Sequence, residues 1–207
     1  MINRRMFLGS TAGLLVDAAE AVPQIKRSHD AALAVLKPSE KVVQHGLERH
    51  AQPLVVESYG FSPRSAIDGA AMRKAIEAGA GPLELEDLNT EMLLMRVADD
   101  PSQQPEYQQA WRASGVTCVL QNAGEEGNSP LRLMKRLAHF TYLTDKLRGF
   151  VSRAAFPADI EAAKKAGRHC LYLTGNGVPL AQEWNSTPEE LSYVRLFQQL
   201  GIRMMHL

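Results

Sequence analysis

The sequence predicts an α/β fold in which parallel strands alternate with crossover helices. Short apolar runs at residues 53–57, 115–121 and 169–174 have the continuous pattern of strands that are covered on both faces. Amphipathic segments of about ten residues or more separate these runs, which is the pattern of βαβ units. No internal repeat or Pro/Gly/Ser-rich linker interrupts residues 53–207, so we expect them to form one unit.

The elements in the first half of the chain follow from local capping signals. Pro38 ends one helix within residues 28–50, and Ser39 is a suitable N-cap for the next. After the first strand, residues 58–69 have the composition of a loop. Asp68 is placed to cap a helix over residues 69–78. Two further helices are expected at residues 84–98 and 105–113.

The second half repeats the alternation of strand and helix. Residues 130–147 carry apolar side chains at helical spacing and predict a long amphipathic helix. Pro157 marks the start of a shorter helix over 158–166. The other expected elements are a short strand at 150–153, a helix at 188–200 and a strand at 203–207.

Composition excludes some classes of function. The 207 residues contain 23 Lys+Arg and 23 Asp+Glu, so the formal net charge is zero and no basic stripe indicates a nucleic-acid partner. The two cysteines, Cys118 and Cys170, lie in apolar runs and are too few for a disulfide framework. Two buried thiols are the simpler interpretation, and a bridge formed in an oxidising compartment is the alternative.

The N-terminus, residues 1–21, has the pattern of a twin-arginine export signal. Arg4 and Arg5 precede a weak apolar run at residues 6–16, and Ala19-Glu-Ala21 offers small residues for cleavage. The run is shorter than the roughly 20 residues that span a bilayer, so we expect no transmembrane anchor. An ordinary N-terminal helix that carries two arginines is the alternative. Residues 22–52 are expected to be a separate helical segment.

Several segments resemble the membrane (renal) dipeptidase family of zinc-dependent β/α-barrel peptidases, and they occur in the order found in that family. Residues 42–56 resemble the approach to its first barrel strand, and residues 111–119 resemble its second strand with the preceding helix. The closest matches are residues 143–147, 158–167 and 200–203. The resemblance covers most of residues 42–207 and implies the N-terminal part of a TIM-type β/α barrel, incomplete at its C-terminal side.

The resemblance also implies a chemistry, the hydrolysis of dipeptide amide bonds by two zinc ions at the C-terminal mouth of the barrel. It places the family's His-x-Asp ligand pair at Tyr59 and Phe61, and its bridging glutamate at Asn176. None of these three side chains is a good zinc ligand. The family's other histidine ligands come from strands later than residue 207. We therefore expect this chain to hold no stoichiometric zinc and to be impaired as a hydrolase.

Four residues are candidates for a substrate pocket because they lie where strands of a barrel end. They are Glu57, Tyr59, Asn122 and Asn176. For Glu57, capping of the following loop is an alternative to a role as ligand or base. Two functions remain open at this point, a divergent exported dipeptidase-like hydrolase and a non-catalytic binding or vestigial protein with a partial barrel. Because a barrel needs about eight strands to close, the open sheet is also expected to be marginally stable and either to self-associate or to need a partner that covers it.

Overall fold

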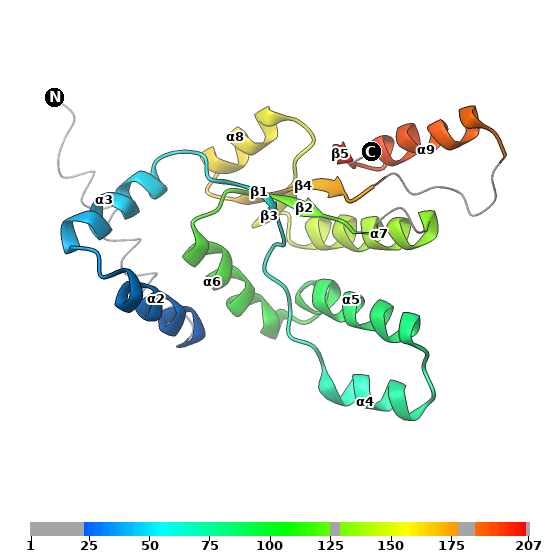
Figure 1. The fold of residues 1–207 in the computed structure, drawn as a ribbon, viewed down its shortest axis with the longest axis horizontal. Helices are drawn as coiled ribbons and strands as arrows, with labels where there is room; N and C mark the ends of the chain where they lie inside the picture. The colour runs from blue at the N-terminus through cyan, green and yellow to red at the C-terminus, as the bar shows by residue number, and fades with distance from the viewer. Residues whose placement is uncertain (1–22, 125–128, 178–184, 206–207) are drawn as a thin grey trace.

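The computed structural model describes residues 23–124, 129–177 and 185–205 (Figure 1). The expected export signal at residues 1–21 and the last two residues of the final expected strand lie outside the described residues. In the described part, the expected parallel α/β fold is confirmed. One parallel sheet has helices packed on both of its faces.

Within the described residues, the sheet contains five parallel strands. Its order is β1-β2-β4-β3, and β5 also pairs with β4. The strands are β1 Val56–Gly60, β2 Cys118–Asn122, β3 Val151–Arg153, β4 His169–Gly175 and β5 Met204–Met205.

The longest strand, β4, organises the sheet. One of its edges pairs with β2 along the register from Cys118↔Cys170 to Asn122↔Thr174. Its other edge is divided, because β3 pairs with the first half of β4 and β5 with the last two residues. Apart from β3, the strands lie side by side in the order in which they occur along the chain, β1-β2-β4-β5, as they do in a β/α barrel. The short strand β3 is an addition to this order. Among the described strands β1 pairs only with β2, so the sheet is open.

Helices α3 (Glu40–Ala51) and α4 (Gly69–Glu77) begin after the capping residues that the sequence indicates, Ser39 and Asp68. The side chains of Ser39 and Asp68 accept hydrogen bonds from backbone N–H groups of the first turn of α3 and α4, and Ser129 and Ser186 do the same for α7 and α9. The helices are α2 Pro23–Leu36, α3 Glu40–Ala51, α4 Gly69–Glu77, α5 Pro82–Asp99, α6 Gln104–Ser114, α7 Pro130–Lys146, α8 Pro157–Lys165 and α9 Thr187–Gln199, with a short 3-10 turn, η1 Pro101–Gln103, before α6.

The first strand differs from the expected position. It runs over Val56–Gly60, whereas the apolar run predicts residues 53–57, and the expected loop at residues 58–69 begins only after Gly60. Pairing decides this, because Val56 is the first residue in register with β2 and Gly60 is opposite Gln121. A bulge between Glu57 and Gly60 extends the strand through polar residues that apolar periodicity does not mark.

The two faces of the sheet are covered very differently. One face, here called the outer face, packs Leu171 and Leu173 into a large core with side chains from α5, α6, α7 and α9. The other, the inner face, carries Cys118 and Cys170 and packs against Ala163 and Ile160 of α8. Helix α8 accordingly lies on the opposite side of the sheet from α6 and α7 (Figure 1).

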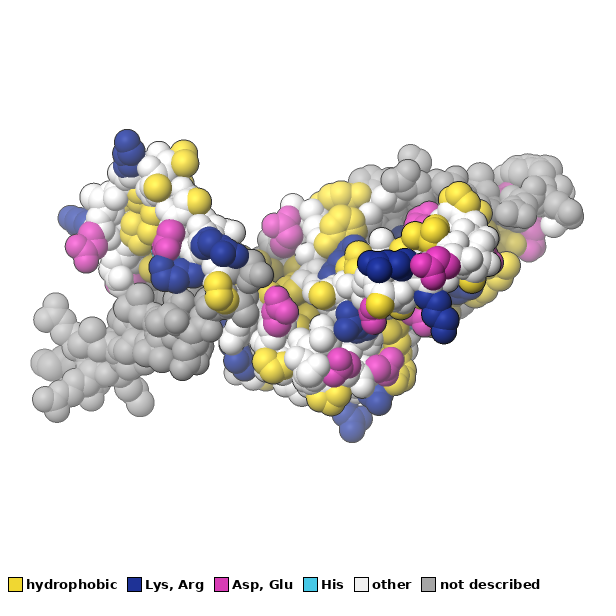
Figure 2. Space-filling view, turned by 90° about the horizontal axis from the view of Figure 1, so that it is seen from below, with side chains coloured by type: hydrophobic (Ala, Val, Ile, Leu, Met, Phe, Trp, Pro, Cys, Tyr) yellow, Lys and Arg dark blue, Asp and Glu magenta, His cyan; other side chains and the backbone are white. Residues whose placement is uncertain are grey.

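Helices α2 and α3, residues 23–51, form an N-terminal arm beside the sheet. Two contacts at its end are a hydrogen bond from His50 Nε2 to the Ser114 carbonyl (2.8 Å) and one from Lys164 Nζ to the Ala51 carbonyl (3.0 Å). Apolar side chains, including Val35 and Leu36, remain on its surface (Figure 2). Within the described ranges, no helix combines the length and the apolar character needed to cross a membrane.

Candidate functional site

Three of the four predicted pocket residues form one hydrogen-bonded cluster at the C-terminal ends of the strands. The phenol of Tyr59, on β1, donates to Oδ1 of Asn176 (2.6 Å) and accepts from Nδ2 of Asn122 (3.3 Å). Asn122 is the last residue of β2, and Asn176 directly follows β4. The three side chains come from neighbouring strands, although 117 positions separate Tyr59 from Asn176 in sequence. We call them the amide cluster.

The backbone fixes the direction of the hydrogen bonds in the amide cluster. Gly124 donates its N–H to Oδ1 of Asn122 (2.7 Å), which leaves Nδ2 of the same amide to face Tyr59. Since the phenol accepts from that NH₂ group, its own proton is directed to Asn176. Gly124 has a φ of +85°, a conformation that favours glycine, so the turn after β2 depends on this residue.

The amide cluster is partly accessible to a ligand. Tyr59 is 50% exposed, whereas Asn122 is only 7% exposed. Thr174 stands beside Asn122 in the β2–β4 register and is almost fully buried. Its hydroxyl makes no hydrogen bond to the described residues. The mouth therefore combines an exposed phenol with more deeply placed amide and hydroxyl groups.

A buried glutamine supports the amide cluster from the outer face of the sheet. Gln121 is fully buried, accepts a hydrogen bond from the backbone N–H of Ser62 (2.7 Å) and donates to the carbonyl of Asn122 (2.7 Å). It ties the loop after β1 to the end of β2. Our sequence prediction did not include Gln121. The available signal was a polar side chain inside the apolar run 115–121. Because side chains alternate along a strand, Gln121 points to the same face as Val119, the face that packs against the outer core.

Glu57, the fourth predicted pocket residue, does not join the amide cluster. Its Oε1 accepts from the backbone N–H of Tyr59 (3.4 Å) within the same strand. A Cβ added at Gly60 would lie 2.9 Å from Cγ of Glu57, so this side chain folds over the bulge. The arrangement matches the alternative interpretation, in which Glu57 caps its own loop.

The residues at the expected ligand positions do not fit a pair of zinc ions. Tyr59 and Asn176 hydrogen bond to one another, and the ring of Phe61 lies 4.3 Å from the guanidinium carbon of Arg64. None of these side chains supplies the carboxylate or imidazole that zinc prefers. Across residues 23–124, 129–177 and 185–205, no group of three or more His, Cys, Asp or Glu side chains could hold a metal ion.

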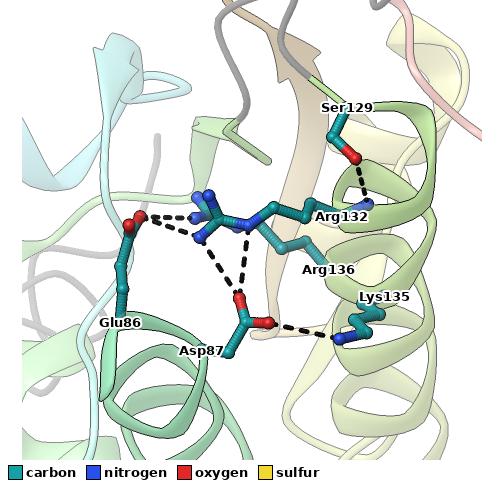
Figure 3. Close-up of polar contacts among 6 residues, drawn as sticks. All are labelled: Glu86, Asp87, Ser129, Arg132, Lys135 and Arg136. Carbon is teal, nitrogen blue, oxygen red and sulfur yellow. Dashed lines mark hydrogen bonds and ion pairs between the residues drawn. The ribbon is translucent and has the colours of Figure 1, made fainter. Parts of the chain in front are cut away.

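A network of ion pairs borders the amide cluster where α5 meets α7 (Figure 3). Glu86 Oε1 lies 3.1 Å from Arg132 and 3.3 Å from Arg136, and Asp87 is shared by Arg132 and Lys135 at 3.2 Å each. The guanidinium of Arg136 reaches the turn after β2, where any Cβ added to Gly124 would overlap it. Positive charge is therefore held next to the backbone group that orients Asn122.

Comparison with known proteins shows no family for this chain. The chain matches no protein-family model and no curated protein. A crystal structure of an amidohydrolase from Pseudomonas aeruginosa is similar to 77% of this chain at 16% sequence identity and a TM-score of 0.43. This chain spans 36% of that amidohydrolase. The fold assignment therefore depends on the strand order and register of the chain itself.

Proposed function

We propose that the C-terminal mouth of the sheet binds the amide group of a dipeptide or similar small amide, by hydrogen bonds and without a pair of zinc ions. The observation that carries this proposal is the chain of hydrogen bonds from Asn122 through Tyr59 to Asn176. The resemblance to membrane dipeptidases supports the choice of dipeptides as the ligand class, because the cluster occupies the corresponding strand ends.

Amide side chains and a phenol suit an amide ligand for a simple chemical reason. A peptide group has one N–H donor and one carbonyl acceptor, and the cluster contains donors and acceptors of the same neutral kind. Neutral hydrogen bonds each contribute about 1 kcal/mol net. We therefore expect the affinity for a free dipeptide to be modest, with a Kd of order 1 mM.

Binding without hydrolysis is the action that this cluster favours. The three residues provide no carboxylate or imidazole, and general bases and water activators in amide hydrolysis are usually of these types. Glu57 is the nearest carboxylate of the predicted set, and it is directed at the backbone of its own strand. Among membrane-dipeptidase-like proteins, this chain would thus be a binding member rather than an efficient hydrolase.

The test is the binding of alanyl-alanine to the full chain by calorimetry, with a matched pair of tyrosine variants. Tyr59→Phe removes the proton that is donated to Asn176 and should weaken binding about five- to tenfold. Tyr142→Phe removes an exposed phenol on α7 that donates a hydrogen bond to Asp99 (2.8 Å). This variant should leave binding unchanged. Absence of saturable binding would reject the proposal, as would zinc-dependent release of free alanine at rates typical of an enzyme.

We also propose that the chain is exported to the periplasm by the twin-arginine pathway, on the basis of the Arg4-Arg5 pair and the weak apolar run that follows. Residues 1–27 fused to a reporter should be exported, and replacement of both arginines by lysine should stop the export. Equal export of the two fusions would exclude this pathway.

A further inference from the structure

The two cysteines of the chain lie next to each other on the inner face of the sheet. Cys118 is the first residue of β2, and it stands opposite Cys170 of β4 in the parallel register. Both side chains are fully buried, and they share one cluster with Ala154 and Ala163. Neighbouring strands lie about 4.8 Å apart, which falls within the Cα–Cα range that disulfides span, about 4.4–6.8 Å. The register therefore brings two thiols from distant parts of the sequence within bonding reach.

The two thiols differ in their tendency to ionise. A hydrogen bond from the Cys170 thiol lowers the pKa of Cys118, although burial acts in the opposite direction. The same contact raises the pKa of Cys170, and burial raises it further. Because the thiolate is the form that attacks a disulfide, Cys118 is suited to act first and Cys170 to complete the bond.

Helix α8 covers this pair and is held to the sheet by few side chains. Its buried residue is Ala163, and Ile160 packs partly against the same cluster. The start of α8 depends on Asp159, whose Oδ2 accepts hydrogen bonds from the backbone N–H groups of Ala155 (2.8 Å) and Phe156 (2.9 Å). A helix with so small an apolar contact opens at a lower free energy than the helices of the outer core. Local opening of α8 would therefore expose the two thiols.

We propose that Cys118 and Cys170 form a dithiol–disulfide site beneath α8, which a small-molecule disulfide or a dithiol oxidase oxidises when α8 opens. The Cys118 thiolate attacks one sulfur of the oxidant, so that a mixed disulfide forms and the first thiolate of the oxidant leaves. Cys170 then loses its proton and attacks the sulfur of Cys118, which releases the second thiolate of the oxidant. The pair is thereby oxidised by two electrons, and the oxidant is reduced to two thiols that take up the two protons of the pair.

The bond would fix the register of β2 with β4. That register ends at Asn122 and Thr174, so the bridge joins, at their start, two strands whose ends position Asn122 and Asn176 of the amide cluster. A disulfide also removes conformations from the unfolded chain, and the loop closed here is long, from residue 118 to residue 170. We expect the melting temperature to rise by about 5–10 °C on oxidation. The inference does not depend on the proposed ligand.

The experiment treats the folded full chain with oxidised glutathione and follows its mass after quenching in acid. The native chain should lose two hydrogen atoms, and peptide mapping without reductant should recover the peptides of Cys118 and Cys170 as one linked species. A chain that stays reduced, or that ends with glutathione bound and no linkage, would overturn the proposal. Linkage that forms only after unfolding in urea would also reject a site in the folded protein.

Matched variants test the part played by α8. Asp159→Ala removes the cap of α8 and should speed oxidation about fivefold, because it makes local opening easier. Asp68→Ala removes the corresponding cap of α4, which packs on α5, and should leave the rate unchanged. Equal acceleration by both variants would show that global unfolding exposes the thiols, and it would reject the site beneath α8.

A cysteine variant tests the order of the two steps. Cys170→Ala retains the thiol that acts first, so it should accumulate the mixed disulfide of Cys118 with glutathione and form no internal bond. Its melting temperature should not rise on oxidation. Failure of this variant to react, in a chain that circular dichroism shows to be folded, would reject Cys118 as the attacking thiol.

Discussion

The two faces of the sheet use the same strands for different purposes. On the outer face, Leu171 and Leu173 are buried in a core that includes Trp111, Phe140 and other large side chains from four helices. On the inner face, the buried cluster among the described residues consists of two cysteines and two alanines. The large apolar side chains of the fold are concentrated on the outer face, so most of the hydrophobic stabilisation comes from there.

The inner face changes character along the strands. Cys118 and Cys170 are fully buried beneath α8 at the start of the strands, whereas Leu120 and Tyr172 in the middle are only partly buried. Asn122 and Thr174 follow at the carboxyl ends, where the amide cluster lies. This gradation resembles the side-chain layers inside a β/α barrel. The polar layer at the mouth is where we propose that the ligand binds.

The largest expected effect is the loss of stability when a large side chain is removed from the outer-face core. Trp111 is fully buried between Tyr107 and His169, so Trp111→Ala should lower the free energy of unfolding by about 3–5 kcal/mol. The inner-face counterpart, Tyr172→Ala, should cost about 1–2 kcal/mol because that side chain is only partly buried. Urea unfolding measures both, and equal losses would contradict the division between the faces.

A smaller effect is expected on self-association, which we propose occurs through the inner face and the β1 edge. Val56 on β1 is 42% exposed, so apolar surface remains at an edge that is unpaired among the described strands. Sedimentation should detect dimers at micromolar concentration. Val56→Lys should weaken dimerisation about tenfold, and Leu83→Lys, on the distant α5, should not. A monomer at all concentrations would reject this prediction.

The smallest effect is a pH dependence that originates on the outer face. His169 is stacked on Trp111 with 4.7 Å between ring centroids, and its Nδ1 donates to the Val116 carbonyl at 2.7 Å. Burial lowers the pKa of His169, and the charges of Arg112 and Lys164 lower it further. The unfolded chain therefore binds the proton first as the pH falls below about 6.5. As the pH falls further, the free energy of unfolding should decline until the pH is below the pKa of His169 in the folded state.

Thermal unfolding at pH 7.5 and pH 5.5 tests this sign. The melting temperature of the native chain should fall at the lower pH, and His169→Gln should make the fall smaller. His45→Gln, on the exposed surface of α3, should reproduce the pH dependence of the native chain. A melting temperature that rises at pH 5.5 would contradict the assigned direction of the pKa.

The sequence by itself determined most of the helices and the parallel character of the sheet. These features depend on local signals, such as the side chains of Ser39 and Asp68 at helix starts and the apolar run at residues 169–174. The effect of such residues on local structure can be predicted from the sequence, because it does not depend on contacts with distant segments. The assignment of Tyr59, Asn122 and Asn176 to one mouth also followed, because parallel strands end at the same edge.

Tertiary structure alone decided which residues meet. The start of β1 at Val56 depends on its register with β2, and the role of Gln121 depends on a backbone N–H that lies 59 positions away. Such contacts arise from pairing and packing between distant segments, and local periodicity contains no information about them.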